Sequence, residues 1–145
     1  MKKSFLVICL VIILFICNAC GRSYFYTYEE LSSGLIGIEI VEINDEKEGV
    51  RTEKIEILKV LNEVEIEECL NELSKIQFYE ISALTSPITV EGKCIKLEYQ
   101  MSSLIICTYG VCDYNKGMDN FLAWKTGDKE KIELLIISLL GNISE

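Results

Sequence analysis

The sequence predicts an α+β domain: a mostly antiparallel sheet of about five strands, with two helices packed on one face. Two patterns support this prediction. Isoleucines alternate with other residues at positions 36, 38 and 40, which is the period of a strand with one buried face. Between Ile66 and Ile76, apolar residues recur every three or four positions, which is the period of a helix. The elements follow in the order ββαβββα.

The first 17 residues are typical of an export signal. Lys2 and Lys3 provide a positive start, and residues 5–17 form an unbroken apolar run of 13 residues. A membrane-spanning helix needs about 20 apolar residues. We therefore expect a cleaved signal peptide over residues 1–19, and an uncleaved anchor helix is the alternative.

The residues that follow the apolar run resemble the cleavage signal of bacterial lipoproteins. Cys17, Asn18, Ala19 and Cys20 stand where that family has an aliphatic residue, two small residues and an obligatory cysteine. Cys17 departs from the usual aliphatic residue. The resemblance implies cleavage between Ala19 and Cys20 and a lipid on the Cys20 thiol. Two acyl chains bind a bilayer durably, whereas one binds marginally.

Residues 20–34 are expected to be a lipid-anchored tether that precedes a single domain over residues 35–145. Aromatic residues at positions 24, 25, 26 and 28 suit either the membrane interface or a short element folded back on the domain. Folding back is the favoured interpretation, because Glu29 and Glu30 would be repelled by an acidic membrane surface.

The first half of the domain is predicted to be a hairpin followed by a helix. Residues 36–61 contain two alternating strands around a polar turn at 44–49. Asn62 and Glu65 match a capping box, so a helix is expected to begin there. Its inward stripe is predicted to consist of Ile66, Cys69, Leu70, Leu73 and Ile76.

The second half is predicted to contain three strands and a last helix. The strands are expected at residues 95–99, 104–109 and 121–124, with a turn at 113–120 before the third of them. The strand at 104–109 is mostly apolar, which indicates that both of its faces are covered. Asp128 is placed to cap a helix that ends at Gly141.

Charge and composition exclude several classes of function. The net charge is −9, and removal of residues 1–19, which hold two lysines and no acidic residue, changes it to −11. Such a surface repels phosphate backbones, so nucleic acid is not expected as a partner. The chain has no histidine, which excludes Ser-His-Asp and Cys-His nucleophilic catalysis. No catalytic constellation is evident, and we expect a protein that is not an enzyme.

The cysteines of the domain do not have the spacing of a zinc site, so no metal or cofactor is expected. Cys69 lies on the inward stripe of the helix and is expected to pack as a small apolar residue. Cys107 and Cys112 would meet in a disulfide only if the chain reverses at residues 109–111, and free packed thiols are the favoured alternative. Residues 113–119 faintly resemble a calcium loop, but the glycine position and Lys116 do not fit one.

The domain also resembles the many small uncharacterised lipoproteins of low-GC Gram-positive bacteria. The resemblance rests on residues 28–31, 38–41, 70–76 and 92–97. It implies a membrane-anchored lipoprotein on the extracytoplasmic face and supports location and fold more than function. Our first hypothesis for the function is a non-enzymatic binding or accessory domain with a protein partner at the cell envelope. The alternative functions are an immunity-type protein that neutralises a toxin and, less favoured, an enzyme that uses carboxylates.

Overall fold

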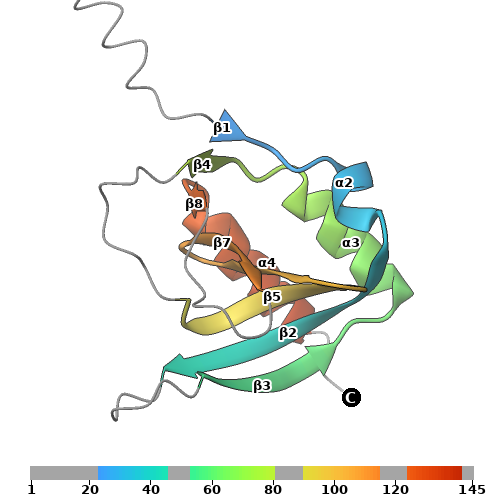
Figure 1. The fold of residues 1–145 in the computed structure, drawn as a ribbon, viewed down its shortest axis with the longest axis vertical. Coiled ribbons are helices and arrows are strands. Elements are labelled where there is room, and N and C mark those ends of the chain that lie inside the picture. The colour runs from blue at the N-terminus through green and yellow to red at the C-terminus, as the bar shows by residue number, and fades with distance from the viewer. Residues whose placement is uncertain (1–22, 46–52, 81–89, 115–123, 142–145) are drawn as a thin grey trace, which may run out of the picture.

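The computed structural model describes residues 23–45, 53–80, 90–114 and 124–141. In these residues the chain forms eight strands and three helices (Figure 1). In chain order they are β1 (Ser23–Tyr24), α2 (Tyr28–Ser32), β2 (Leu35–Asp45), β3 (Glu53–Val60), α3 (Glu63–Leu73), β4 (Phe78–Glu80), β5 (Gly92–Tyr99), β6 (Ser103–Cys107), β7 (Gly110–Tyr114), β8 (Trp124–Thr126) and α4 (Lys129–Gly141).

The described strands form one antiparallel sheet in the order β1-β4-β8-β7-β6-β5-β2-β3. In Figure 1, α4 passes behind strands β7 and β5 of this sheet, and α3 contacts α4. The predicted α+β class, with a mostly antiparallel sheet, is therefore confirmed. The sheet has more strands than the five expected, because β1, β4 and β7 were not recognised in the sequence.

The two faces of the sheet carry different cores. The helix face is covered by all three helices, and its strand residues include Ile38, Ile40, Ile95, Leu97 and Ile106. We call the opposite side the cysteine face. Its buried core consists of Val41, Ile43, Val90, Cys94, Ile105, Cys107 and Cys112. Strand β6 is buried on both sides from Leu104 to Cys107, as its apolar sequence predicted.

The segment expected to be a tether is part of the fold from Ser23 onward. Strand β1 pairs with β4, and the ring of Tyr26 packs edge-on against Phe78 with centroids 5.6 Å apart. Helix α2 begins with a capping box between Thr27 and Glu30 and buries Leu31. The Tyr99 hydroxyl donates to the Leu31 carbonyl oxygen at 2.8 Å, which ties α2 to β5. The described domain thus begins before residue 35.

Helix α3 follows the sequence prediction closely. Asn62 accepts from the amides of Val64 and Glu65, and the Glu65 carboxylate accepts from the Asn62 amide, so the capping box is confirmed. The inward stripe is also confirmed, with Cys69, Leu70, Leu73 and Ile76 buried and Ile66 partly buried.

Helix α4 begins after Asp128, whose carbonyl accepts from the amides of Lys131 and Ile132. The Asp128 carboxylate accepts instead from the Gln77 amide at 3.1 Å, and it pairs with Lys131 at 3.0 Å. These contacts hold the pKa of Asp128 below its usual value, the Gln77 amide being the main cause. The Asp128 side chain thus fastens the start of α4 to the segment before β4, whereas only the Asp128 backbone carbonyl accepts from amides of α4, so the side-chain cap predicted from the sequence is not formed.

Candidate functional site

The predicted lipid-attachment residue Cys20 and its neighbour Ala19 lie outside the described residues, as does residue 17. Within the described residues, no helix is long and apolar enough to cross a membrane. The segment that resembles a calcium loop lies mostly outside the described residues as well. The described site that remains is a groove between α4 and one end of the sheet.

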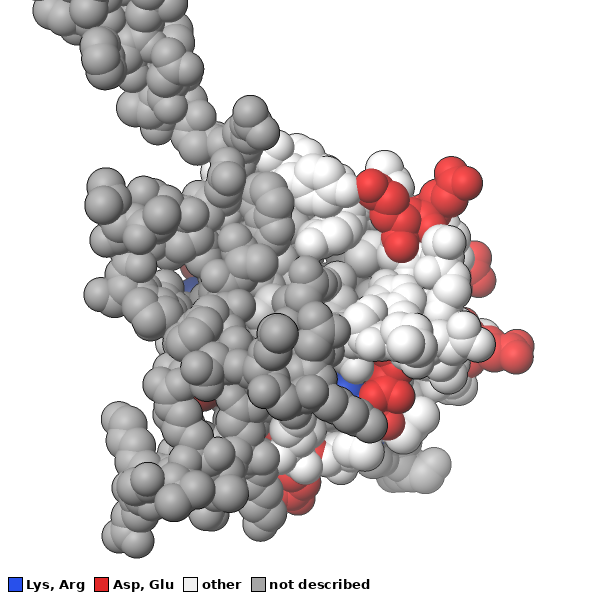
Figure 2. Space-filling model, viewed as in Figure 1, with Lys and Arg blue, Asp and Glu red and all other residues white. Residues whose placement is uncertain are grey.

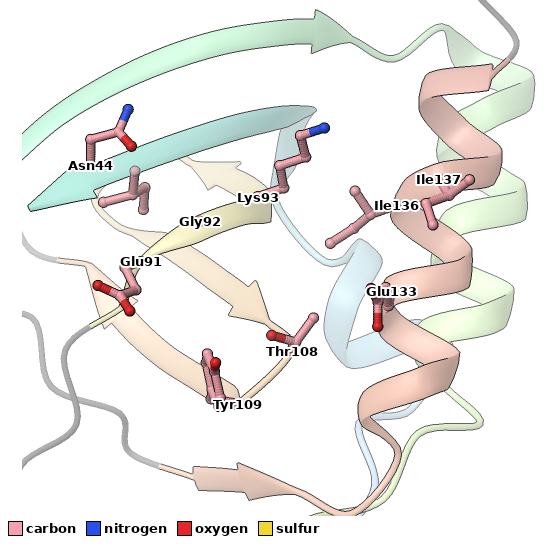
Figure 3. A pocket seen from close by; sticks show the side chains of 10 residues that line it. Asn44, Glu91, Gly92, Lys93, Thr108, Tyr109, Glu133, Ile136 and Ile137 are labelled. Atoms are coloured by element: carbon pink, nitrogen blue, oxygen red, sulfur yellow. The ribbon is translucent and has the colours of Figure 1, made fainter.

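The groove has a volume of about 600 Å³ and is lined by residues from four parts of the fold (Figure 3). Strands β2 and β5, the turn between β6 and β7, and helix α4 all contribute to it. The lining residues are Ile43, Asn44, Glu91, Gly92, Lys93, Thr108, Tyr109, Glu133, Ile136 and Ile137.

The groove forms where the helix face of the sheet changes from apolar to polar. Ile40 pairs with Ile95 beneath the helices, and both are fully buried. Two residues further along β2, Glu42 pairs with Lys93 on the same face. Asn44 and Glu91 continue this polar end. Strands β2 and β5 thus extend past the apolar core, and their polar ends form the groove beside α4.

The groove is acidic, with an apolar rim. Glu91 and Glu133 contribute carboxylates from opposite sides, and Lys93 contributes one ammonium group (Figure 3). On α4, the Ile137 side chain is 57% exposed, and Tyr109 is exposed across the groove. The ammonium of Lys129 lies 5.0 Å from the centre of the Tyr109 ring, in a cation–π contact that fixes the ring at the rim.

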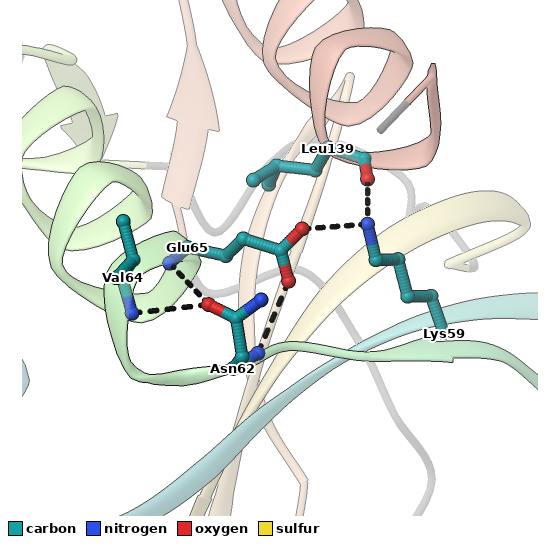
Figure 4. Close-up of polar contacts among 5 residues, drawn as sticks. All are labelled: Lys59, Asn62, Val64, Glu65 and Leu139. Carbon is teal, nitrogen blue, oxygen red and sulfur yellow. Dashed lines mark hydrogen bonds and ion pairs between the residues drawn. The ribbon is translucent and has the colours of Figure 1, made fainter. Parts of the chain in front are cut away.

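The wall of the groove is held by a polar contact at the far end of α4 (Figure 4). Lys59 of β3 donates to the Leu139 carbonyl oxygen at 2.6 Å and to Glu65 Oε1 at 2.7 Å. The hydrogen bond from Lys59, then that from the Asn62 amide, holds the pKa of Glu65 below its usual value. One lysine therefore joins α3, α4 and the edge of the sheet.

Three cysteines lie on the opposite face of the same strands. Cys94 of β5, Cys107 of β6 and Cys112 of β7 are all fully buried. Cys107 is a free thiol whose register partner on β7 is Gly110, whereas Cys112 pairs with Ile105. The structure therefore contains no Cys107–Cys112 bond. Cys69 is fully buried, as expected of a small apolar residue, and burial raises the pKa of its thiol to about 12.

Exposed acidic side chains line the edge of the domain formed by α2 and α3. Figure 2 shows Asp and Glu side chains along the edge formed by α2 and α3, with few basic side chains in view. The exposed acidic residues of these helices are Glu29, Glu30, Glu63, Glu67, Glu68 and Glu72. On the cysteine face, Lys96 is held between the carboxylates of Glu39, at 3.3 Å, and Glu98.

Among the described residues, no cluster of His, Cys, Asp or Glu has the arrangement of a metal site. Sequence reasoning did not identify the groove, because its residues are far apart in the chain. No protein-family model matches the chain, and no curated protein and no solved structure is significantly similar to it. The groove and the predicted N-terminal signal are therefore the basis for the proposal that follows.

Proposed function

We propose that the chain is a lipoprotein, anchored by lipid on Cys20 to the extracytoplasmic face of the cell membrane, whose domain binds a protein partner at the envelope. The groove beside α4 is the observation that supports binding. The sequence pattern, in which Ala19 and Cys20 follow a 13-residue apolar run, supports the anchor.

The chemistry of the groove favours a basic segment of the partner. Glu91 and Glu133 lie on its sides, Glu42 is the cross-strand neighbour of Lys93, and the mature chain has a net charge of −11. Such a surface attracts Lys and Arg and repels acidic partners. The exposed side chains of Ile137 and Tyr109 offer apolar contacts beside these charges. An extended segment with alternating basic and apolar residues would contact both the acidic and the apolar side chains of the groove.

Site-specific photo-crosslinking in the protein's own cells tests the binding. A photoreactive residue replaces Ile137 in the groove, and a matched control replaces Val64, which is 76% exposed and lies outside the groove. We expect an adduct from position 137 and none from position 64. Mass spectrometry of the adduct should identify a partner segment that carries Lys or Arg.

Charge reversal then tests the electrostatic part of the proposal. Glu133→Lys should abolish the adduct at position 137, because it places a positive charge beside a basic segment. Glu56→Lys changes an exposed carboxylate on β3, outside the groove, and should leave the adduct unchanged. An acidic partner segment, or equal loss in both variants, would contradict the proposal. A toxin as the partner would make the chain an immunity protein.

The lipid anchor has its own test. Cells are grown with labelled palmitate, and the protein is recovered from membranes. Cys20→Ser should remove the label and block cleavage, whereas Cys17→Ser should leave both unchanged, since the bulky Ile16 precedes Cys17. If the palmitate label persisted in Cys20→Ser, the proposed lipid anchor would be refuted. The proposal that the groove binds a partner would be unaffected.

A further inference from the structure

Two of the cysteines on the cysteine face are directly opposite each other on neighbouring strands. Strands β5 and β6 pair with Ile95 opposite Ile106, and one further step along this register places Cys94 opposite Cys107. Both side chains are fully buried on the same face, and the Cys94 thiol also donates to the Gly92 carbonyl oxygen at 3.4 Å. The interaction with Cys107 is the main cause that raises the pKa of Cys94. The pair is thus in contact inside the protein.

The hydrogen-bond pattern of the β5–β6 hairpin shows whether Cys94 and Cys107 form a hydrogen-bonded or a non-hydrogen-bonded pair. At the turn end, the Tyr99 amide donates to the Ser102 carbonyl at 2.9 Å, so these residues form a hydrogen-bonded pair. Antiparallel pairs alternate in type, which makes Cys94 and Cys107 a non-hydrogen-bonded pair. The Cα atoms of such pairs lie about 4.5 Å apart. Disulfides span Cα separations of about 4.4 to 6.8 Å.

The third cysteine of this face is less well placed. Cys112 lies opposite Ile105, two residues along from the position that faces Cys107. Diagonal neighbours on adjacent strands are about 7 Å apart or more. The two Cβ atoms of a disulfide are only about 3.5 to 4.5 Å apart, so Cys94 fits Cys107 and Cys112 does not.

We propose that Cys94 and Cys107 form a cross-strand disulfide in the mature protein, and that the structure holds the reduced form. This inference rests on the proposed export, because disulfides persist in oxidising compartments outside the cytoplasm. The oxidant is an external disulfide, such as that of a thiol–disulfide oxidoreductase. Since both thiols are buried, they react before the sheet closes or when the β6–β7 hairpin opens.

The exchange proceeds in two steps. The Cys107 thiolate attacks one sulfur of the oxidant, forming a mixed disulfide and releasing one thiol. Cys94 then loses its proton and attacks the Cys107 sulfur, so the Cys94–Cys107 bond forms and the second thiol leaves. Two cysteine thiols are oxidised, and one disulfide is reduced to two thiols.

The surroundings favour Cys107 as the attacking thiol. It ends β6 at the turn, and its hydrogen bonds to Cys94 and to the amides of Tyr109 and Gly110 lower its pKa against the opposing effect of burial. The hydrogen bond to Cys107 and burial raise the pKa of Cys94. The two thiols therefore differ in reactivity although they share one site.

The bond would also affect the groove. Lys93 and Thr108 are the immediate neighbours of Cys94 and Cys107, and both line the groove on the opposite face of the sheet. A covalent link between the two cysteines would fix the ends of β5 and β6 beneath the groove. The redox state of the pair is thereby coupled to the shape of the proposed binding site.

Peptide mapping of the purified full-length protein tests the pairing. The protein is equilibrated with oxidised and reduced glutathione, acid-quenched, and alkylated in denaturant. Digestion with trypsin and chymotrypsin separates Cys107 from Cys112, because chymotrypsin cleaves after Tyr109. We expect residues 94–96 linked to a fragment that ends at Tyr109, with Cys69 and Cys112 alkylated.

Variants and a cellular readout complete the test. Cys107→Ala should abolish the linked peptide, and Cys69→Ala should leave its yield unchanged. In the wild-type protein, alkylation of all four cysteines of the described domain (Cys69, Cys94, Cys107 and Cys112) would overturn the proposal, as would a Cys107–Cys112 link. This readout does not depend on any variant folding. Failure of export would instead appear as loss of lipid label on Cys20, so the two failures are distinguishable.

Discussion

Lys59 is the residue whose removal tests the stability argument most directly. Its ammonium donates to the carbonyl of Leu139, in the last turn of α4, at 2.6 Å, and also to Glu65. The side chains of Lys59 and Glu65 are only 13% and 11% exposed. Lys59→Met retains the apolar stem and removes the charge and both hydrogen bonds.

The cost of Lys59→Met follows from these contacts. A hydrogen bond from a charged donor contributes about 1.5–3 kcal/mol. A cation near a helix C-terminus adds about 0.3–1 kcal/mol. We therefore expect the free energy of unfolding to fall by about 2–3 kcal/mol, since the Leu139 carbonyl loses its donor. The matched control is Lys75→Met, which removes a pair with Glu72 whose side chains are 63% and 49% exposed. Exposed pairs of this kind contribute about 0.5 kcal/mol or less.

Urea unfolding of the purified full chain, followed by far-ultraviolet circular dichroism, measures both variants. Because the slope for small proteins is about 1–3 kcal/mol per molar urea, Lys59→Met should lower the midpoint by about 1 M or more. Lys75→Met should lower it by only a few tenths of a molar. Equal midpoints for the two variants would refute the assignment of Lys59 as the tie between α3, α4 and the sheet.

Three further changes have defined outcomes in the same assay. Tyr99→Phe should cost about 1 kcal/mol, because the hydrogen bond that fastens α2 is lost; an unchanged midpoint would contradict this. Gly92→Ala should cost about 1–2 kcal/mol because its φ is +83°, while Gly37→Ala in the extended β2 should not destabilise. Asp128→Asn should be less stable than wild type at pH 6. Folding lowers the pKa of the Asp128 carboxyl. The stability that the carboxylate contributes is therefore fully present above the unfolded pKa of about 3.9, and it is lost as the pH falls through the lower pKa of the folded state. The difference should therefore shrink at pH 3, and a constant difference would count against the carboxylate contact.

Local signals in the sequence predicted the long elements of the fold. The capping box of Asn62 and Glu65 lies within four residues, so the start of α3 was readable without knowledge of the sheet. The long strands β2 and β5 show the two-residue period over enough positions to be recognised. In contrast, β1 and β4 have two and three residues, which is too few to show any period.

Strand β7 was missed for a different reason. The chain reverses at Thr108 and Tyr109, and neither Gly nor Pro stands at the centre of this turn. Gly110 is already the first residue of the next strand. The polar residues after Cys112 resembled a turn more strongly. On α4, the apolar residues Leu134 and Ile137 are both exposed. Of the two, only Ile137 lines the groove.

The groove could not be predicted from the sequence, since it depends on tertiary placement. Asn44 and Glu91 approach each other only because β2 pairs with β5, and Glu133 reaches the same place from the last helix. Each of these residues alone is an ordinary solvated side chain. The sequence does show where the strands turn polar, but only the register shows that those positions adjoin.

One pattern links the cysteines to the groove. In four strands, two consecutive residues are both buried, which happens when a sheet is covered on both faces. These pairs are Ile40-Val41, Cys94-Ile95, Ile105-Ile106 and Val111-Cys112. Two of the four contain a cysteine on the cysteine face, where a small apolar side chain suits a tightly packed layer. Successive residues of a strand point to opposite faces, so a change at Cys94 or Cys107 acts within one residue of the groove. The proposed disulfide on one face and the proposed binding groove on the other would therefore not be independent in this fold.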